Sequence, residues 1–488
     1  MSCRHMNFGA VALLALATAT GTTAAPAVRP APPAHSIAVL PFLNMDDDPR
    51  QDYFSDGLSE ELLNSLSGIA ALQVVARTSS FSFKHRQDTV AEVGRQLNVA
   101  SVLEGSVRRS GNKVQITAQL SDAGNGNALW SKSYDREFKD VLALPAEIAD
   151  SVATALKVAL PGENRAVLGL GGTRNPKAFD AYLRAFAITG GDRESNDRSM
   201  LAAFDQAILD DSDYAMAQSH RAALILDIAT HWLPDRVAIQ REVEEARSGA
   251  EKAIALAPNL GYAHAVLAEI LNAGYLDFAG AMAEYDRALA LDPGNAQLLR
   301  DYAAFAVDMG RRDQAVAAAQ RSIVLDPMNA DSQDTLARVM YYARRYPEAL
   351  AAARRAQAMN PHFKDYFTLA GFIDLAQGKP ERAIASCSAD PDWFPLTCLA
   401  IAYRKLNDAG RAEHMLARLR EISGDASLYQ QARIYAQWGT TDRALEALER
   451  AHQVRDPALE ALKADPMVDP LRSEQKFDAV LQALKFPR

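Results

Sequence analysis

Residues 281–327 decide the fold, and they read AMAEYDRALALDPGNAQLLRDYAAFAVDMGRRDQAVAAAQRSIVLDP. This stretch holds two copies of one pattern, in which small and apolar residues precede a proline at fixed distances. The pattern occurs four times in the chain and ends at prolines spaced by 35, 34 and 34 residues: Pro258, Pro293, Pro327 and Pro361. Small residues three and four positions apart lie on one face of a helix, where a neighbouring helix can approach closely. Each proline then ends its helix, because it lacks an amide hydrogen.

A second row of residues indicates that each period contains two helices. Its members repeat every 33 to 35 residues, about two dozen residues ahead of each proline: Leu267-Ala268, Tyr302-Ala303, Leu336-Ala337 and Leu369-Ala370. A helix–turn–helix unit of about 34 residues resembles the tetratricopeptide repeat (TPR). Such units bury their apolar faces only by stacking on one another, so we expect an all-α solenoid. It covers residues 177–488, with the clearest repeats at about 240–361.

The beginning of the chain has the features of a secretion signal. Basic residues near position 4 precede an apolar run over 8–19, and small residues follow up to Ala27. We expect residues 1–27 to be a cleaved signal peptide, or an uncleaved membrane anchor if the apolar stretch is long enough to span a bilayer. Residues 28–35 are rich in proline and form a tether.

Residues 36–160 follow a different pattern, which predicts an α/β domain. Strands are expected at 36–42 and 72–77, and helices at 53–69, 90–97 and about 146–159. Residues 101–138 break into three strand-like runs at turns rich in glycine and asparagine. Residues 161–176 are rich in glycine and predict a linker to the helical half.

Several motifs of this domain resemble the TolB-like domain. They are IAVLPF (37–42), YFSDGLSEELLNSLSGI (53–69), VVARTSSFSFK (74–84), VLEGSVRRSGNKVQITAQLSDA (102–123) and LWSKSYDREFKDVLALPAEIA (129–149). The resemblance implies a chain related to bacterial envelope sensors, transcriptional regulators and cyclase-associated TPR proteins. Together with the signal at residues 1–27, it implies a location in the periplasm, or at the inner membrane facing the periplasm. Membrane association would then come from the N-terminal segment.

The composition argues against a nucleic-acid partner and against catalysis. The net charge is −9, whereas nucleic-acid affinity comes largely from clustered lysine and arginine. The sequence contains no phosphate-binding loop, no H-E-x-x-H zinc motif and no G-x-S-x-G nucleophile motif. We therefore expect no catalytic residue, no metal ligand and no cofactor.

The first helices of the repeats predict a groove for a protein or peptide partner. Positions counted from the small residue of each first helix give a groove of mixed charge: Glu269, Arg300, Asp331, Asp334, Arg338 and Tyr341.

Two cysteines, Cys387 and Cys398, flank a proline-containing turn, and they form either a disulfide or two buried thiols. Residues 79–84 alternate hydroxyl and aromatic side chains, and they either dock a partner or cap the core.

Together these features predict a non-enzymatic, exported TPR adaptor that mediates protein–protein interactions in the bacterial envelope. The alternative is the sensory, ligand-binding part of a signalling system related to membrane-bound transcriptional regulators.

Overall fold

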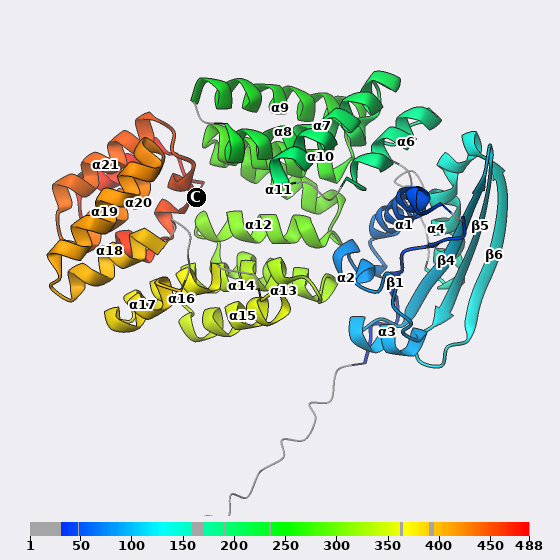
Figure 1. The fold of residues 1–488 in the computed structure, drawn as a ribbon, viewed down its shortest axis with the longest axis horizontal. Helices are drawn as coiled ribbons and strands as arrows, with labels where there is room; N and C mark the ends of the chain where they lie inside the picture. The colour runs from blue at the N-terminus through cyan, green and yellow to red at the C-terminus, as the bar shows by residue number, and fades with distance from the viewer. Residues whose placement is uncertain are drawn as a thin grey trace, which may run out of the picture.

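The computed structural model describes residues 31–46, 48–158, 170–188, 192–233, 236–361, 365–389 and 395–487. A sheet with its helices forms one end of the molecule, and pairs of helices extend away from it (Figure 1). The predicted signal peptide and most of the predicted linker lie outside the described residues. Within the described part of the chain, no helix combines the length and the apolar character needed to cross a membrane.

The first domain is built on a mixed sheet with the strand order β3-β1-β4-β5-β6, in which β2 also pairs with β4. β1 runs parallel to β3 and β4, whereas β4, β5 and β6 form an antiparallel meander. The strands are β1 (Ser36–Val39), β2 (Leu43–Asn44), β3 (Gln73–Val74), β4 (Ser101–Ser110), β5 (Lys113–Asp122) and β6 (Ala128–Glu137). In β5 the buried residues alternate with more exposed ones, so one face of the sheet packs on a core.

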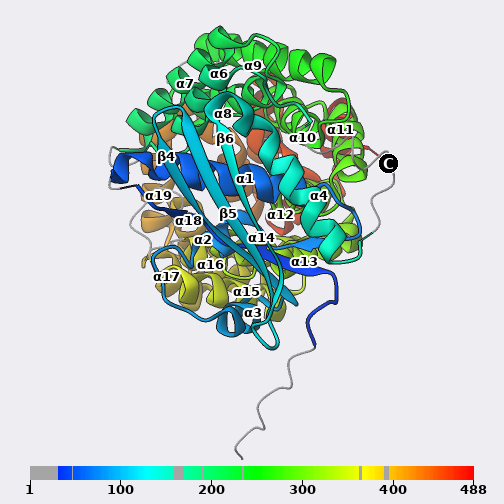
Figure 2. The same ribbon diagram turned by 90° about the vertical axis from the view of Figure 1, so that its right-hand side faces the viewer.

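Helices pack on both faces of this sheet, with α1 and α4 on one face and α3 on the other. α1 lies between the sheet and the helical array, and α4 packs against α1 and β6 (Figures 1 and 2). The bounds are α1 (Asp52–Ser67), α2 (Arg77–Phe81), α3 (Val90–Leu97) and α4 (Leu144–Ala155), with 3-10 turns η1 (Pro49–Gln51) and η2 (Phe138–Ala143). The expected strand at 72–77 is wrong beyond Val74, because the chain turns into α2 at Arg77.

The second part is an array of antiparallel helix pairs. The first pairs are α6 (Pro176–Ala185) with α7 (Arg193–Asp210), α8 (Ala215–Trp232) with α9 (Arg236–Leu256), and α10 (Gly261–Glu269) with α11 (Phe278–Leu291). A π-helical turn, η3 (Ile270–Gly274), follows α10. The next are α12 (Ala296–Asp308) with α13 (Arg312–Leu325), α14 (Ala330–Tyr342) with α15 (Tyr346–Met359), and α16 (Asp365–Ala376) with α17 (Pro380–Cys387). The last are α18 (Pro395–Lys405) with α19 (Ala409–Ser423), and α20 (Leu428–Gln437) with α21 (Thr441–Gln453).

The four prolines stand where the pattern predicted. The helices α9, α11, α13 and α15 end at Leu256, Leu291, Leu325 and Met359, each two residues before its proline. The small residues that precede the prolines are buried between helices, among them Ala281, Ala315 and Ala349. The structure therefore confirms an α/β first part followed by an all-α array of helix pairs.

The chain ends by returning to the middle of this array. A 3-10 turn, η4 (Gly424–Ser427), lies between α19 and α20. After α21 come two more 3-10 turns, η5 (Pro457–Lys463) and η6 (Pro466–Leu471), and the last helix α22 (Gln475–Ala483). The ring of Phe486 stacks on Phe278 of α11, with centroids 4.6 Å apart.

Candidate functional site: the inner face of the repeats

The inner face is the surface formed by α10, α12 and α14, the first helices of three successive pairs. It carries the predicted groove residues. Four of them are exposed or partly buried, and the other two are held inside the protein by an ion pair or by burial. Glu269 and Asp331 are exposed, and Arg300 and Asp334 are partly buried. Arg338 is partly buried and ion-paired, and Tyr341 is buried.

The first domain closes one end of the inner face. The amide and the hydroxyl of Ser79 both donate to Oδ1 of Asp326, at 3.0 and 2.6 Å. The Ser79 hydroxyl oxygen in turn accepts a 2.8 Å hydrogen bond from the amide of Met328. A backbone hydrogen bond of 2.8 Å from Ala76 to Leu325 continues this contact. The turn between α13 and α14 is therefore the docking point of α2.

This contact decides between the two interpretations of residues 79–84. Ser79 docks onto the repeats of its own chain, whereas Phe83 is buried in a small core beside α3. The segment does both things, but its docking partner is internal.

The C-terminal segment covers the other end of the inner face. The side-chain amide of Asn272 donates to Glu460 at 2.8 Å, and Arg338 lies 3.3 Å from the same carboxylate. Arg344 forms two hydrogen bonds to Asp469, at 2.6 and 2.8 Å. Because η5 and η6 supply these carboxylates, this part of the predicted groove is already occupied.

Arg338 and Tyr341 correct the predicted groove. Arg338 is held by a 2.6 Å ion pair to Asp308, whose side chain is buried. Tyr341 is only 3% exposed, and Arg433 of α20 and Asp465, which lies between η5 and η6, are close enough to act on its hydroxyl. The repeat register placed both side chains on the inner face, but it could not show that a distant segment lies over them.

The open centre of the inner face is acidic. Burial raises the pKa of Glu269 to about 7, and the nearby carboxylates of Asp301, Asp227 and Glu460 add to this shift. Burial likewise raises the pKa of Asp301 to about 6, although Arg300 opposes it. Glu269 reaches solvent, yet it stands in a concave surface that holds the carboxyl away from bulk water. Asp227 and Glu460 are paired with Arg193 and Arg338, and Asp301 lies 3.7 Å from Arg300. Glu269, by contrast, has no ion pair within the described part of the chain.

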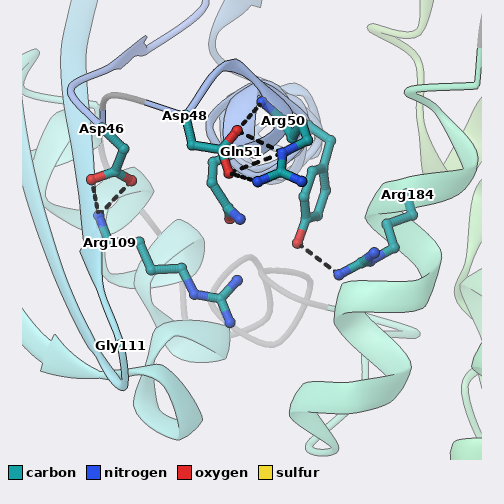
Figure 3. A pocket seen from close by; sticks show the side chains of 8 residues that line it. Asp46, Asp48, Arg50, Gln51, Arg109, Gly111 and Arg184 are labelled. Carbon is teal, nitrogen blue, oxygen red and sulfur yellow. Dashed lines mark hydrogen bonds and ion pairs between the residues drawn. The ribbon is translucent and has the colours of Figure 1, made fainter.

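A second hollow, of about 760 Å³, lies where the first domain meets α6 (Figure 3). The arginines that line it are largely paired with carboxylates of the protein itself. Arg184 contacts Asp180 at 2.8 Å, and Arg109 lies 3.6 Å from the same carboxylate. Tyr53 donates a 2.6 Å hydrogen bond to Asp180 and accepts one from Arg184 at 3.3 Å. This cluster joins α1 and the sheet to the first helix of the array.

The structure joins Cys387 of α17 to Cys398 of α18 by a disulfide, with Cα atoms 6.5 Å apart. Both cysteines are fully buried. Gly371 of α16 lies so close that a Cβ there would meet Cys387 Sγ at 2.0 Å, so the bridge requires a glycine at this position. The sequence left two alternatives open, a disulfide or two buried thiols, and the structure contains the disulfide.

Among the described residues, no three histidine, cysteine, aspartate or glutamate side chains gather as metal ligands would.

Comparison with solved structures finds TPR proteins that match part of this chain. A TPR protein from Parabacteroides merdae is 12% identical and covers 54% of this chain and 98% of its own, with a TM-score of 0.39. YrrB, described as a TPR protein with an unusual peptide-binding site, is 18% identical over 44% of this chain and 99% of its own, with a TM-score of 0.30. PilF from Pseudomonas aeruginosa is 18% identical over 42% of this chain and 93% of its own, with a TM-score of 0.32.

One curated relative matches by sequence. "Putative adenylate cyclase 3" from Rhizobium meliloti (strain 1021) is 41% identical over 160 residues, which is 33% of this chain. The matched part spans about a quarter of that protein, 27% of its length. Residues 277–339, from the turn before α11 to α14, match the tetratricopeptide repeat family. The chain therefore contains tetratricopeptide repeats at the position where the proline spacing predicted them.

Proposed function

We propose that this protein is a non-enzymatic, exported adaptor whose repeats bind a short basic segment of a partner protein. One observation carries the proposal, namely the acidic centre of the inner face between the two covered ends. Glu269 and Asp301 both have raised pKa values there, and Arg300 is the cation that opposes the shift of each. A lysine or arginine side chain of a partner would supply the missing positive charge.

The two covered ends limit the length of the bound segment. Ser79 and Asp326 mark the boundary on the side of the first domain. Glu460 and Arg338 mark the boundary on the side of the C-terminal turns. The partner would therefore lie across α10 and α12, rather than along the whole array as an unobstructed solenoid allows.

The sequence motifs of residues 36–160 support a TolB-like first domain, and the features of residues 1–27 support export to the periplasm or anchoring at the inner membrane. The relative named as a cyclase shares only a third of this chain. In our proposal the cyclase name belongs to other parts of that protein, and this chain acts by binding. Mass-spectrometric determination of the mature N-terminus in a periplasmic fraction tests the location.

Fluorescence anisotropy tests the basic partner. The probes are two labelled ten-residue peptides, one alternating lysine with alanine and the other glutamate with alanine. We expect the lysine peptide to bind the full-length protein more tightly, and Glu269→Gln or Asp301→Asn to weaken that binding about threefold to fivefold. Glu449→Gln, an exposed glutamate on α21, is the matched control and should leave binding unchanged. Equal affinity for the two peptides, or no effect of either groove variant, would contradict the proposal.

The alternative function, a ligand-binding sensory module, is favoured by a different observation. A cavity lies between the first domain and the repeats, and both parts contribute to its walls.

A further inference from the structure

The cavity between the two parts of the chain has a volume of about 540 Å³. This lies within the range of small-molecule sites, about 300–1,000 Å³. α1 supplies one wall with Glu60 and Glu61, and the array supplies the facing side with Phe186, His220 and Tyr262. The three rings come from the end of α6, from α8 and from α10, respectively.

The three rings form a continuous aromatic wall. The His220 ring lies 5.1 Å from Phe186, edge to face, and 4.5 Å from Tyr262, measured between centroids. A 3.1 Å hydrogen bond between the Tyr262 hydroxyl and His220 Nδ1 fixes the last pair. Burial lowers the pKa of His220 to about 3, so its ring is neutral and does not repel a cation.

Glu61 has an incomplete set of partners in this cavity. Its Oε1 atom is buried and has no hydrogen-bond partner within the described part of the chain. Its neighbour Glu60 is instead paired with Arg77, at 3.0 Å. A buried carboxyl oxygen without a partner is costly, because a polar group removed from water needs a compensating interaction.

The charges around the cavity favour a positively charged ligand. Its lining holds two guanidinium groups, Arg77 and Arg300, against the five carboxyl groups of Glu60, Glu61, Asp292, Asp326 and Asp331. Asp326 is bound to Ser79, whereas Asp292 is bound through Oδ2 to Asn295, and its buried Oδ1 has no hydrogen-bond partner within the described part of the chain. Glu61 is the carboxyl group nearer the aromatic wall, because it interacts with Tyr182, whose ring lies 5.6 Å from that of His220.

We propose that this cavity binds an alkylammonium group, which lies against the rings of Phe186, His220 and Tyr262, and that Glu61 releases its proton to the solvent on binding and becomes the counter-ion. Aromatic faces attract large organic cations through their quadrupole, and quaternary ammonium groups are bound in this way. A small hard metal ion would need several oxygen ligands at close range, whereas no three carboxyl, histidine or cysteine side chains gather as such ligands within the described part of the chain. The expected ligand is a small organic amine. A lysine side chain of a peptide carries the same alkylammonium group.

Isothermal titration calorimetry on the full-length protein tests the site with choline. Its neutral isostere 3,3-dimethylbutan-1-ol is the matched probe, and N-acetyl-lysine amide stands for a lysine side chain. We expect saturable binding of choline with one site per chain, and at least about tenfold weaker binding of the neutral isostere. Glu61→Gln should weaken choline binding by about tenfold, and Phe186→Leu by about threefold to tenfold.

Two controls keep the test decisive. Glu449→Gln should bind choline as the unchanged protein does, and circular dichroism of each variant verifies that it is folded. Because Glu61→Gln and Phe186→Leu disturb different walls of the cavity, a folding defect in one leaves the other to decide. Binding of N-acetyl-lysine amide but not choline would assign the site to a lysine side chain. No saturable binding of either cation, or equal binding of the neutral isostere, would overturn the proposal.

This inference does not depend on the basic peptide proposed for the inner face. Glu269→Gln should weaken the peptide and leave choline binding unchanged, whereas Phe186→Leu should do the reverse. The failure of one proposal is thereby distinguishable from the failure of the other.

Discussion

Replacing Glu61 by glutamine should stabilise the protein increasingly as the pH rises. Burial raises the pKa of Glu61 to about 8, and repulsion from Glu60 adds to this, whereas a hydrogen bond from Tyr182 lowers it. Tyr214, which precedes α8, is also close enough to interact with Glu61. In the unfolded chain the pKa is near its ordinary value of 4.5. Above that pH the folded state holds one more proton than the unfolded state, so its stability falls as the pH rises towards 8.

The magnitude follows from the size of the shift. One pKa unit corresponds to about 1.36 kcal/mol, so the destabilisation by Glu61 grows by about 3.5 kcal/mol between pH 5 and pH 8. Glutamine keeps the shape and one hydrogen-bonding oxygen but cannot ionise, and the variant escapes this loss. Its melting temperature should exceed that of the unchanged protein by about 3 °C at pH 8 if the whole chain unfolds together. The difference should be about 10 °C if the first domain unfolds alone.

Differential scanning calorimetry at half-unit steps from pH 5 to pH 8 measures this difference directly. Other buried carboxyls, such as Asp292, also have raised pKa values, but they are present in both proteins and cancel in the comparison. Glu449→Gln provides the flat baseline expected for an exposed side chain. If the difference in melting temperature between Glu61→Gln and the unchanged protein stays constant or shrinks as the pH rises, the inference that Glu61 is buried without a neighbouring cation is refuted.

Three further substitutions address the contacts that shape the inner face. Ser79→Ala removes the hydroxyl shared with Asp326 and should cost about 1–2 kcal/mol, seen as faster hydrogen exchange at the turn between α13 and α14. Arg338→Ala leaves the buried Asp308 carboxyl without its ion pair and should cost about 3 kcal/mol in denaturant unfolding. Cys387→Ser opens a loop with a sequence separation of 11 and should lower stability by about 2–3 kcal/mol, whereas reductant should then have no further effect.

Matched variants separate these contacts from general effects of substitution. Ser133→Ala alters a hydroxyl on the exposed strand β6, and Arg354→Ala removes an exposed guanidinium on α15. Both should change stability by less than about 0.5 kcal/mol. Unaltered exchange in Ser79→Ala, or an Arg338→Ala variant as stable as Arg354→Ala, would show that the corresponding contact is not formed in solution.

Sequence reasoning was accurate where the cause of the structure is local. A proline ends its helix through its own ring, so the ends of α9, α11, α13 and α15 could be placed within two residues. The hairpin turns of the first domain follow from residues such as Gly111, which has a φ of 61°. The helix at 90–97 begins at a capping box formed by Thr89 and Glu92, which is also a local signal.

The candidate site depended on contacts between distant parts of the chain, and these could not be predicted. Ser79 and Asp326 are separated by 247 residues, and Asn272 and Glu460 by 188. The aromatic wall likewise combines side chains from three helices, and periodicity assigns such residues only to a core. The repeat pattern therefore predicted the correct face of α14 for Arg338. It could not predict that the Glu460 carboxylate lies against Arg338 on that face.

The return of the chain end to the middle of the array has a consequence for the order of folding. Successive repeats can stack as soon as each leaves the ribosome, because their contacts are with immediate neighbours. Asn272 and Arg338, however, must wait for Glu460, which is synthesised long after them. During synthesis a nascent chain thus presents a longer bare inner face than the finished molecule does, and only the last segment shortens it to the part that the proposed partner would contact.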